Sequence, residues 1–244
     1  MRVAVYNQMF GLNGRNLVSA LKGNLSMYSP LNPKDEISGA DINRTIEVIT
    51  ASKADVIGIC EILEGQEKEL KDKLFDLGYK HVYFEQGRKT KMSDLFMNVA
   101  VASKIKCDKV VVEDFPSKDS FGGGGGFVHC YFPELKLDII HIHMGYNKSN
   151  TYFQQLGFLQ GYLKKLYGNV ILMGDFNLSY DKLKEFFGDL TLASNGIKSC
   201  STTPVIKEFI NEDYDHIFVK GFENCRAGEL EGHSDHKLIY VDLE

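Results

Sequence analysis

The segment Gly174-Asp175-Phe176-Asn177 combines residue types that can orient a water molecule and bind an anion. It follows the apolar segment 169–173. In an extended segment Asp175 and Asn177 project to one side, while Phe176 points into the core on the other. An anionic oxygen beside an amide suits orienting a nucleophilic water and contacting a phosphoryl oxygen. An Asx-rich turn is the structural alternative, and we favour the functional interpretation.

Two segments near the C-terminus combine histidine with aspartate. Ser234-Asp235-His236 precedes the apolar segment 237–243, and Asp215 is the second residue of the predicted strand 214–219. A histidine whose tautomer is fixed by a carboxylate is a standard general base, and Asp215 can hold an imidazole in this way. A surface turn is the alternative for the Ser-Asp-His segment, but its position before an apolar strand favours a functional site.

Four more polar residues follow or end apolar segments. Asn7 ends segment 2–7, where a turn residue is the alternative, and Glu61 directly follows segment 54–60. Glu61 is either a solvated loop residue or a ligand for a hard cation, because Mg²⁺ and Mn²⁺ prefer carboxylate oxygen. His141 and His143 lie on one side of a predicted strand at a spacing that resembles a zinc ligand pair. No third His or Cys ligand has a clear sequence partner, so we expect one structural histidine and one that faces the site.

Alternating apolar segments and helical periodicity define the elements that position these residues. A helix over 41–52 begins at the N-cap Asp41, a helix over 67–77 ends at Gly78, and a third spans 151–167. Residues 8–40 are rich in Gly, Asn, Ser and Pro and predict a long loop with a short helix over 17–22. Strands are predicted over 2–7, 54–60, 80–85, 98–103, 109–114, 127–132, 135–143, 169–173, 214–219 and 237–243.

This mixture of strands and helices predicts a layered α/β or α+β sandwich, with polar residues clustered at strand ends on one rim. The five glycines at 122–126 predict a flexible hairpin turn. A phosphate-binding loop is the alternative, but no Gly-Lys-Ser/Thr follows.

Composition limits the class of protein. The 244 residues are 43% hydrophobic and 25% charged, which predicts one large folded core. With a net charge of -5, the chain lacks the overall excess of basic residues that is usual in proteins that bind nucleic acid through its phosphates. An acidic balance fits an enzyme that gathers carboxylates around a metal. Five scattered cysteines without Cys-x-x-Cys predict neither a disulfide framework nor a zinc-thiolate site. Without an evident signal peptide or long apolar segment, we expect a cytoplasmic protein away from membranes, with a mature secreted form as the alternative.

Together these segments resemble the endonuclease/exonuclease/phosphatase superfamily, and the resemblance covers residues 3–242. Cys60 stands where the family commonly has Gln, and Met144 where it commonly has Leu, but neither change removes a reactive group. Seven elements occur in the family's order: Asn7, Cys60-Glu61, Asn98-Val99-Ala100-Val101, His143-Met144, Gly174-Asp175-Phe176-Asn177, Asp215-His216-Ile217 and Ser234-Asp235-His236.

The resemblance implies one domain over residues 1–244, a four-layered α/β/β/α sandwich with two packed mixed sheets between helices. It also implies a divalent metal, Mg²⁺ or Mn²⁺. Glu61 would bind this metal with Asn7 nearby, and Asp235 would contribute to the metal site or to its water network.

The resemblance assigns catalytic roles to the other motif residues. Asp175 and Asn177 would align the attacking water and the phosphate. His236, oriented by Asp215, would act as general base or as a cation that stabilises the phosphate. His143 would neutralise phosphoryl oxygens or protonate the leaving group.

For the substrate, we rank phosphodiesters of DNA or RNA first and a small phosphoester of the inositol phosphate kind second. The absence of Trp disfavours an abasic-site endonuclease, and the lack of a long apolar hairpin disfavours a sphingomyelinase. Asn7, Asn98 and Tyr146 are expected to contact the substrate. Basic residues that could touch a polyanion are Arg15, Lys22, Arg44, Arg88, Lys89, Lys91 and Lys148, with a solvated loop as the alternative for segment 88–91.

A non-catalytic binding module on the same scaffold is the alternative from another class, since fold does not fix function. The presence of Glu61, His143, Asp175 and His236 favours an enzyme, because a decayed site should have lost some of them. We expect a monomer.

Overall fold

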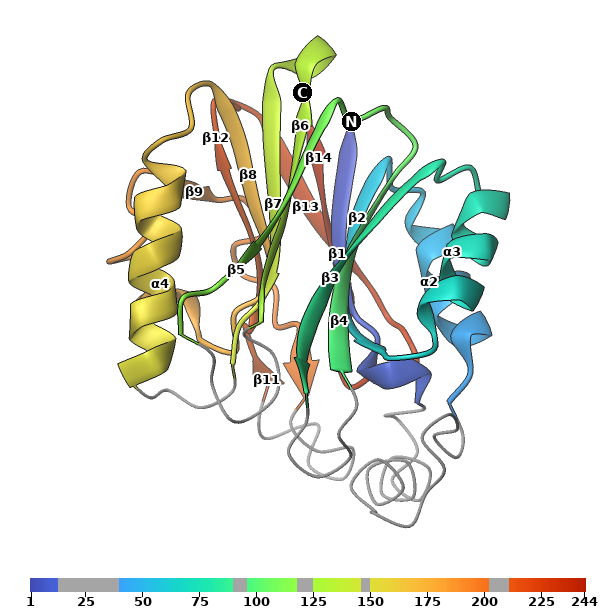
Figure 1. The fold of residues 1–244 in the computed structure, drawn as a ribbon. Coiled ribbons are helices and arrows are strands. Elements are labelled where there is room, and N and C mark those ends of the chain that lie inside the picture. The colour runs from blue at the N-terminus through green and yellow to red at the C-terminus, as the bar shows by residue number, and fades with distance from the viewer. Residues whose placement is uncertain (13–39, 90–95, 118–124, 146–149, 202–210) are drawn as a thin grey trace.

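Two β-sheets pack face to face between layers of helices in the computed structural model of the protein (Figure 1). The structure describes residues 1–12, 40–89, 96–117, 125–145, 150–201 and 211–244. The predicted four-layered α/β/β/α sandwich with mixed sheets is confirmed. The basic residues at 15, 22, 91 and 148, Tyr146 and the predicted helix over 17–22 lie outside the described residues.

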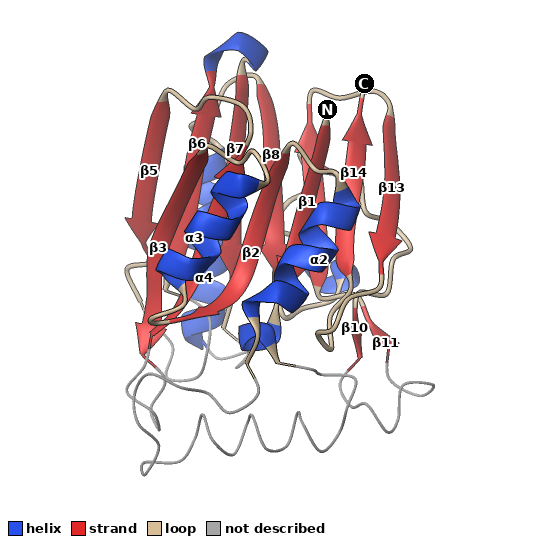
Figure 2. Ribbon diagram, turned by 90° about the vertical axis from the view of Figure 1, so that its right-hand side faces the viewer, coloured by secondary structure: helices blue, strands red, loops and turns tan. Residues whose placement is uncertain are grey.

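The first sheet has the strand order β13-β14-β1-β2-β4-β3. β1 and β2 are parallel, and the other neighbours are antiparallel. The helix α2 lies between β1 and β2 in the sequence, and α2 and α3 cover the outer face of this sheet (Figures 1 and 2). The elements are β1 (Arg2–Asn7), α2 (Ile42–Ser52), β2 (Val56–Leu63), α3 (Glu67–Asp76), β3 (His81–Lys89), β4 (Phe96–Ser103), β13 (Cys225–Leu230) and β14 (Leu238–Leu243).

The second sheet has the strand order β5-β6-β7-β8-β12-β9. Here β7 and β8 form the parallel pair, and the intervening helix α4 covers the outer face (Figure 1). The elements are β5 (Lys109–Asp114), β6 (Gly126–Phe132), β7 (Leu137–His143), α4 (Asn150–Leu163), β8 (Asn169–Asp175), β9 (Thr191–Leu192) and β12 (Asp215–Lys220). Short elements are η1 (Met9–Gly11), η2 (Pro133–Leu135), α5 (Tyr180–Leu183), β10 (Cys200–Ser201) and β11 (Asn211–Glu212).

The core follows from strand alternation. Val3 and Val5 of β1 pack between the two sheets, while Ala4 and Tyr6 pack under α2. A parallel pair needs a crossover, and both crossovers here contain a helix. Each sheet therefore brings the carboxyl ends of two neighbouring strands to one rim of the sandwich.

Several described segments differ from the sequence predictions. β3 extends to Lys89 rather than ending at Glu85, so residues 88 and 89 lie in a strand and not in the predicted loop. β2 extends through a bulge to Leu63 rather than ending at Cys60, and α4 ends at Leu163 rather than at 167. β13 was not predicted, because it is a largely exposed edge strand without apolar alternation. Its Gly228 leaves room for the ring of Tyr240 on β14, whose hydroxyl would lie 2.3 Å from an added Cβ.

The glycine segment lies between two paired strands. Gly126 opens β6 opposite Asp114 of β5, and the two strands are antiparallel. Residues 122–124 lie outside the described part of the chain. Among the described helices, none has the length and apolar character needed to span a membrane.

Candidate active site

Six of the predicted site residues lie at the same rim because of strand direction. The two parallel pairs are β1/β2 and β7/β8. Asn7, His143 and Asp175 are the last residues of β1, β7 and β8, and Glu61 lies near the end of β2. β12 is antiparallel to β8, and β14 is antiparallel to β1. The beginnings of these two strands therefore bring Asp215 and His236 to the rim as well.

Asp175 lies at the centre of the cluster. Its Oδ2 accepts a hydrogen bond from Asn7 Nδ2 at 3.0 Å, and its Oδ1 accepts one from the Asn177 backbone at 2.8 Å. The Nε2 atoms of His143 and His236 lie 3.7 Å and 3.9 Å from Asp175 Oδ2. Asp175 is 1% exposed. One buried carboxylate thus faces an amide and two imidazoles from both sheets.

A tight turn sets the position of this carboxylate. Gly174 has φ +149°, and a Cβ there would lie 2.0 Å from the carbonyl oxygen of Ile142 on β7. Asn177 has φ +49°, so the segment is not extended as predicted from alternation. Instead, the Asp175 side chain accepts from the Asn177 backbone in an Asx turn. Phe176 is fully buried, and its carbonyl accepts from the Tyr152 hydroxyl at 2.6 Å.

Asp215 holds His236. The Nδ1 of His236 lies 2.6 Å from Asp215 Oδ2, and the backbone N–H of His236 donates to Ser234 Oγ at 3.0 Å. Burial by itself lowers the pKa of His236, but the Asp215 carboxylate outweighs it, and the pKa lies well above its usual value. Burial also raises the pKa of the Asp215 carboxyl. The pair therefore favours an imidazolium whose Nε2 is directed toward Asp175.

Glu61 lies at the bulge of β2. The register between β2 and β4 shifts between Ile59 and Ile62, and Glu61 adopts φ +57°. A left-handed backbone is uncommon for glutamate and occurs where surrounding structure enforces it, often at functional sites. Glu61 Oε1 lies 3.9 Å from His143 Nε2. Burial and the charge of Asp235 raise the pKa of Glu61 to about 8.

The donor set fits a divalent metal. Glu61 and Asp235 are close enough for charge repulsion, and both side chains are partly exposed. Asp175, Asp215 and His236 each offer a ligand atom within 4.8 Å of the others. Within the described residues, the buried Oδ1 of Asp215 has no hydrogen-bond partner. Carboxylate oxygens are the ligands that hard divalent cations prefer.

The two histidines of β7 have different environments. His141 is fully buried between the sheets, and an added Cβ on Gly58 of β2 would lie 2.3 Å from its Nδ1. Burial lowers the pKa of His141 to about 4. His143 lies two residues further along the strand and reaches the rim, where its Nε2 is 3.4 Å from Asn177 Nδ2. One histidine is thus part of the core and the other faces the site, as expected.

Asn98 is not joined to this cluster by the contacts of the described residues. Its amide donates to Glu67 Oε1, and its side-chain oxygen accepts from the Gly87 backbone at 3.2 Å. Arg44 donates to the carbonyl of Gly11 at 3.1 Å. Residues 88 and 89 belong to β3, and their side chains lie outside the described part of the structure.

Two residues near the site had no clear signal in the sequence. Cys200 lies beside His236, although it had counted only as one of five scattered cysteines. The hydroxyl of Tyr6 accepts from the Ser234 backbone at 3.3 Å and so helps to hold the Ser-Asp-His turn. Both contacts join segments that are far apart in the sequence, which local patterns cannot reveal.

Two mixed sheets packed between helices, with carboxylates and imidazoles gathered at one rim, define the structural class of this chain as a four-layered α/β sandwich. The chain belongs to the Endonuclease/Exonuclease/phosphatase family, whose family model matches residues 24–236. A comparison with curated proteins gives no match.

Solved structures with the same fold are distant in sequence. An endonuclease/exonuclease/phosphatase family protein from Leptotrichia buccalis has a TM-score of 0.68 at 15% identity, covering 100% of this chain and 99% of that one. A humanized D. rerio TDP2 has a TM-score of 0.68 at 14% identity, covering 100% and 98%. The 3' phosphatase NExo from Neisseria, bound to a product DNA hairpin, has a TM-score of 0.65 at 14% identity, covering 100% and 99%.

Proposed function

We propose that this protein is a Mg²⁺- or Mn²⁺-dependent phosphodiesterase that cleaves DNA or RNA by direct attack of an activated water. The observation that carries the proposal is the arrangement around Asp175. This buried carboxylate is bonded to Asn7 and lies within 3.9 Å of two imidazoles, one of which is held by a second carboxylate. Hydrolysis of a phosphoester needs a positioned water and stabilisation of negative charge, and these groups supply both.

In this mechanism Asp175 orients the attacking water and accepts its proton. Asn7 fixes one oxygen of this carboxylate, and the Asn177 backbone fixes the other. His236 acts as the cation that stabilises phosphoryl oxygens, because Asp215 raises the pKa of His236. This favours one of the two roles that the sequence had left open for His236, the other being general base.

His143 and Asn177 contact the phosphoryl group or the leaving oxygen. Burial lowers the pKa of His143, so its ring is neutral and donates a hydrogen bond rather than a charge. Asn177 Nδ2 donates to the Met144 carbonyl at 2.9 Å, which fixes the amide beside His143. We propose that Asn7, Asn98 and Tyr146 contact the substrate.

Glu61 would hold the metal together with Asn7 and Asp235, all of which carry oxygen ligands. When bound, the metal neutralises charge on the phosphoryl oxygens and acts as a Lewis acid. The structure of NExo with a DNA product supports nucleic acid as the substrate class. We further propose that residues 1–244 act as one domain and one monomer in the cytoplasm.

The test is hydrolysis of an activated phosphodiester, plasmid DNA, RNA, a 3'-phosphorylated oligonucleotide and inositol phosphates, each with Mg²⁺ or with a chelator. We expect metal-dependent cleavage of a diester and a fall in kcat of about 10²-fold or more in Asp175→Ala. Cleavage of monoesters alone would establish the phosphatase alternative. If none of these substrates is hydrolysed, the result would favour the alternative that the protein is a non-catalytic binding module.

A further inference from the structure

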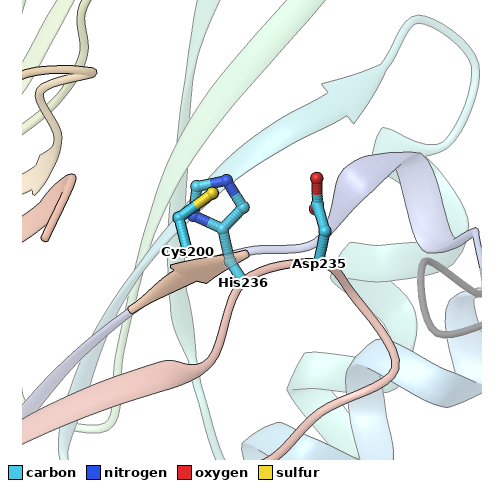
Figure 3. Close-up of side chains that lie close together, drawn as sticks. All are labelled: Cys200, Asp235 and His236. Carbon is cyan, nitrogen blue, oxygen red and sulfur yellow. The ribbon is translucent and has the colours of Figure 1, made fainter. Parts of the chain in front are cut away.

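Cys200, Asp235 and His236 form a cluster of mixed ligand atoms (Figure 3). The cluster shares Asp235 and His236 with the proposed active site and adds Cys200 to them. Cys200 comes from β10, and the other two residues come from the turn before β14. One sulfur, one nitrogen and one oxygen lie within 4.8 Å of one another. Cys200 and His236 are buried, while Asp235 is partly exposed.

The backbone holds the two segments together. Cys200 and His236 face each other in an isolated antiparallel bridge. Next to this bridge, the backbone N–H of Lys237 donates to the carbonyl of Ser199 at 2.7 Å. Residues directly opposite in an antiparallel pair have neighbouring side chains. The proximity of the Cys200 and His236 side chains therefore follows from the pairing of the two backbone segments.

The imidazole is oriented as a metal ligand would be. Its Nδ1 is bound to Asp215 at 2.6 Å, which leaves Nε2 as the ligand atom. In metal sites, a ligating histidine almost always donates its other ring nitrogen to a carboxylate or carbonyl. Asp235 has its own partner, because Ser234 Oγ donates to its Oδ1 at 3.1 Å. Two of the three candidate ligands thus already have supporting hydrogen bonds.

The types of ligand select the cation. Thiolate, imidazole and carboxylate are the ligands of Zn²⁺, whereas Mg²⁺ takes oxygen ligands alone. Bonds of about 2.0–2.3 Å place the ligands of a tetrahedral zinc site roughly 3.3–3.8 Å apart. The ligand atoms of the three residues lie within 4.8 Å of one another, so each pair would have to approach by about 1.5 Å at most to bind such an ion.

We propose that Cys200 Sγ, His236 Nε2 and the Asp235 carboxylate bind Zn²⁺ and that this ion inhibits the protein. Binding forms a metal–sulfur and a metal–nitrogen bond, and the protons of the thiol and of Nε2 leave to solvent. The inhibition rests on the proposed function, because it removes His236 from the phosphate and Asp235 from the Mg²⁺ site. The binding of Zn²⁺ itself does not depend on that function.

The binding test uses Co²⁺ as a spectroscopic probe for zinc, added to the full chain in excess Mg²⁺. Wild type and Cys225→Ser are expected to show a thiolate-to-cobalt charge-transfer band that Zn²⁺ removes, and Cys200→Ser is expected to lack it. Cys225 is the matched control because it is a free, exposed cysteine. Circular dichroism and the Tm of Cys200→Ser and of Cys200→Ala show whether each variant is folded. A band that persists in a folded Cys200 variant, or that is absent from wild type, would overturn the proposal.

The inhibition test compares Zn²⁺ titrations of Mg²⁺-dependent hydrolysis, each normalised to the activity of the same variant without zinc. We expect the zinc concentration for half inhibition to rise at least about tenfold in Cys200→Ser, since loss of even an outer-shell partner costs about 10- to 100-fold in metal affinity. Equal inhibition of Cys200→Ser and Cys225→Ser would refute an inhibitory role. If no phosphoester is hydrolysed at all, the proposed function fails, while the cobalt band still decides whether the metal site exists.

Discussion

At the scale of single residues, the charge of His236 depends on Asp215, which lies 2.6 Å away. The pKa of His236 is raised in the folded protein, so it binds a proton more tightly there than in the unfolded chain. The stability that this extra proton affinity of His236 contributes is therefore present below the unfolded pKa of 6.5 and is lost as pH rises through the folded pKa. The proposed role of His236 as a cation should follow the same pH dependence.

We predict that Asp215→Asn lowers the pKa of His236 and moves the alkaline limb of the pH–rate profile to lower pH. The physical reason is that the imidazolium loses its carboxylate partner while its burial, which lowers the pKa, remains. NMR titration of His236 and kcat/KM against pH measure the two shifts. His233→Gln is the control, because His233 pairs with Glu47 at the surface. An unchanged alkaline limb would argue against the cationic role.

Glu61 gives a prediction of the same sign, because its folded pKa is also raised. Its pKa is raised from 4.5 to about 8, so the metal-free folded state keeps a proton that the unfolded state releases. Stability should fall as pH rises from 4.5 to about 8. We expect Glu61→Gln to have a higher Tm than wild type in chelator above this pKa, and no such advantage below pH 4.5. Mg²⁺ should raise the Tm of wild type more than that of the variant.

At the scale of elements, the turn after β8 depends on Gly174. A Cβ there would lie 2.0 Å from the Ile142 carbonyl oxygen of β7, and φ is +149°. We predict that Gly174→Ala destabilises the protein by about 2–4 kcal/mol, as measured by urea unfolding. Gly157→Ala in α4 is the control, because its Cβ meets nothing within 4 Å, and it should be neutral or stabilising. Equal stability of the two variants would contradict the close approach of β7 and β8.

Much of the fold was predictable because strand alternation and helix caps are local. β1 and β5 begin and end at the predicted residues, and Asp41 caps α2 by accepting from the Asn43 backbone. The bulge at Glu61 was not predictable, because it arises from a register shift against β4, which comes about 40 residues later. β13 was missed for a related reason: its place at the sheet edge comes from pairing with β14.

In the candidate site, too, local features were predictable from the sequence and contacts between distant segments were not. The Asp-x-Asn pair and the Ser-Asp-His turn stand next to apolar strands, so their positions at strand ends followed from the sequence. The proximity of Cys200 to His236 did not, because a bridge between distant segments creates it.

At the scale of the whole molecule, the site depends on how the two sheets pack. His141 fills space between them, and burial lowers its pKa to about 4. Because the unfolded chain binds a proton at this histidine more tightly than the folded protein does, the protein becomes less stable as pH falls from 6.5 toward 4.

We therefore predict that His141→Leu weakens the loss of stability on acidification, because the apolar side chain has no proton to bind. Urea midpoints measured at several pH values between 6.5 and 4 test this. The surface variant His233→Gln should follow wild type. Parallel pH curves for wild type and His141→Leu would show that His141 is not responsible.

The order of strands in the first sheet has a consequence for synthesis of the protein. β1 lies between β2 and β14, and the N-terminal amino group donates to the carbonyl of Leu243 at 3.0 Å. A growing chain on the ribosome therefore holds Asn7 and Asp175 long before His236 and β14 have been translated. Its first strand therefore has one edge unpaired until β14 is made, and the proposed active site is complete only when β14 closes that edge.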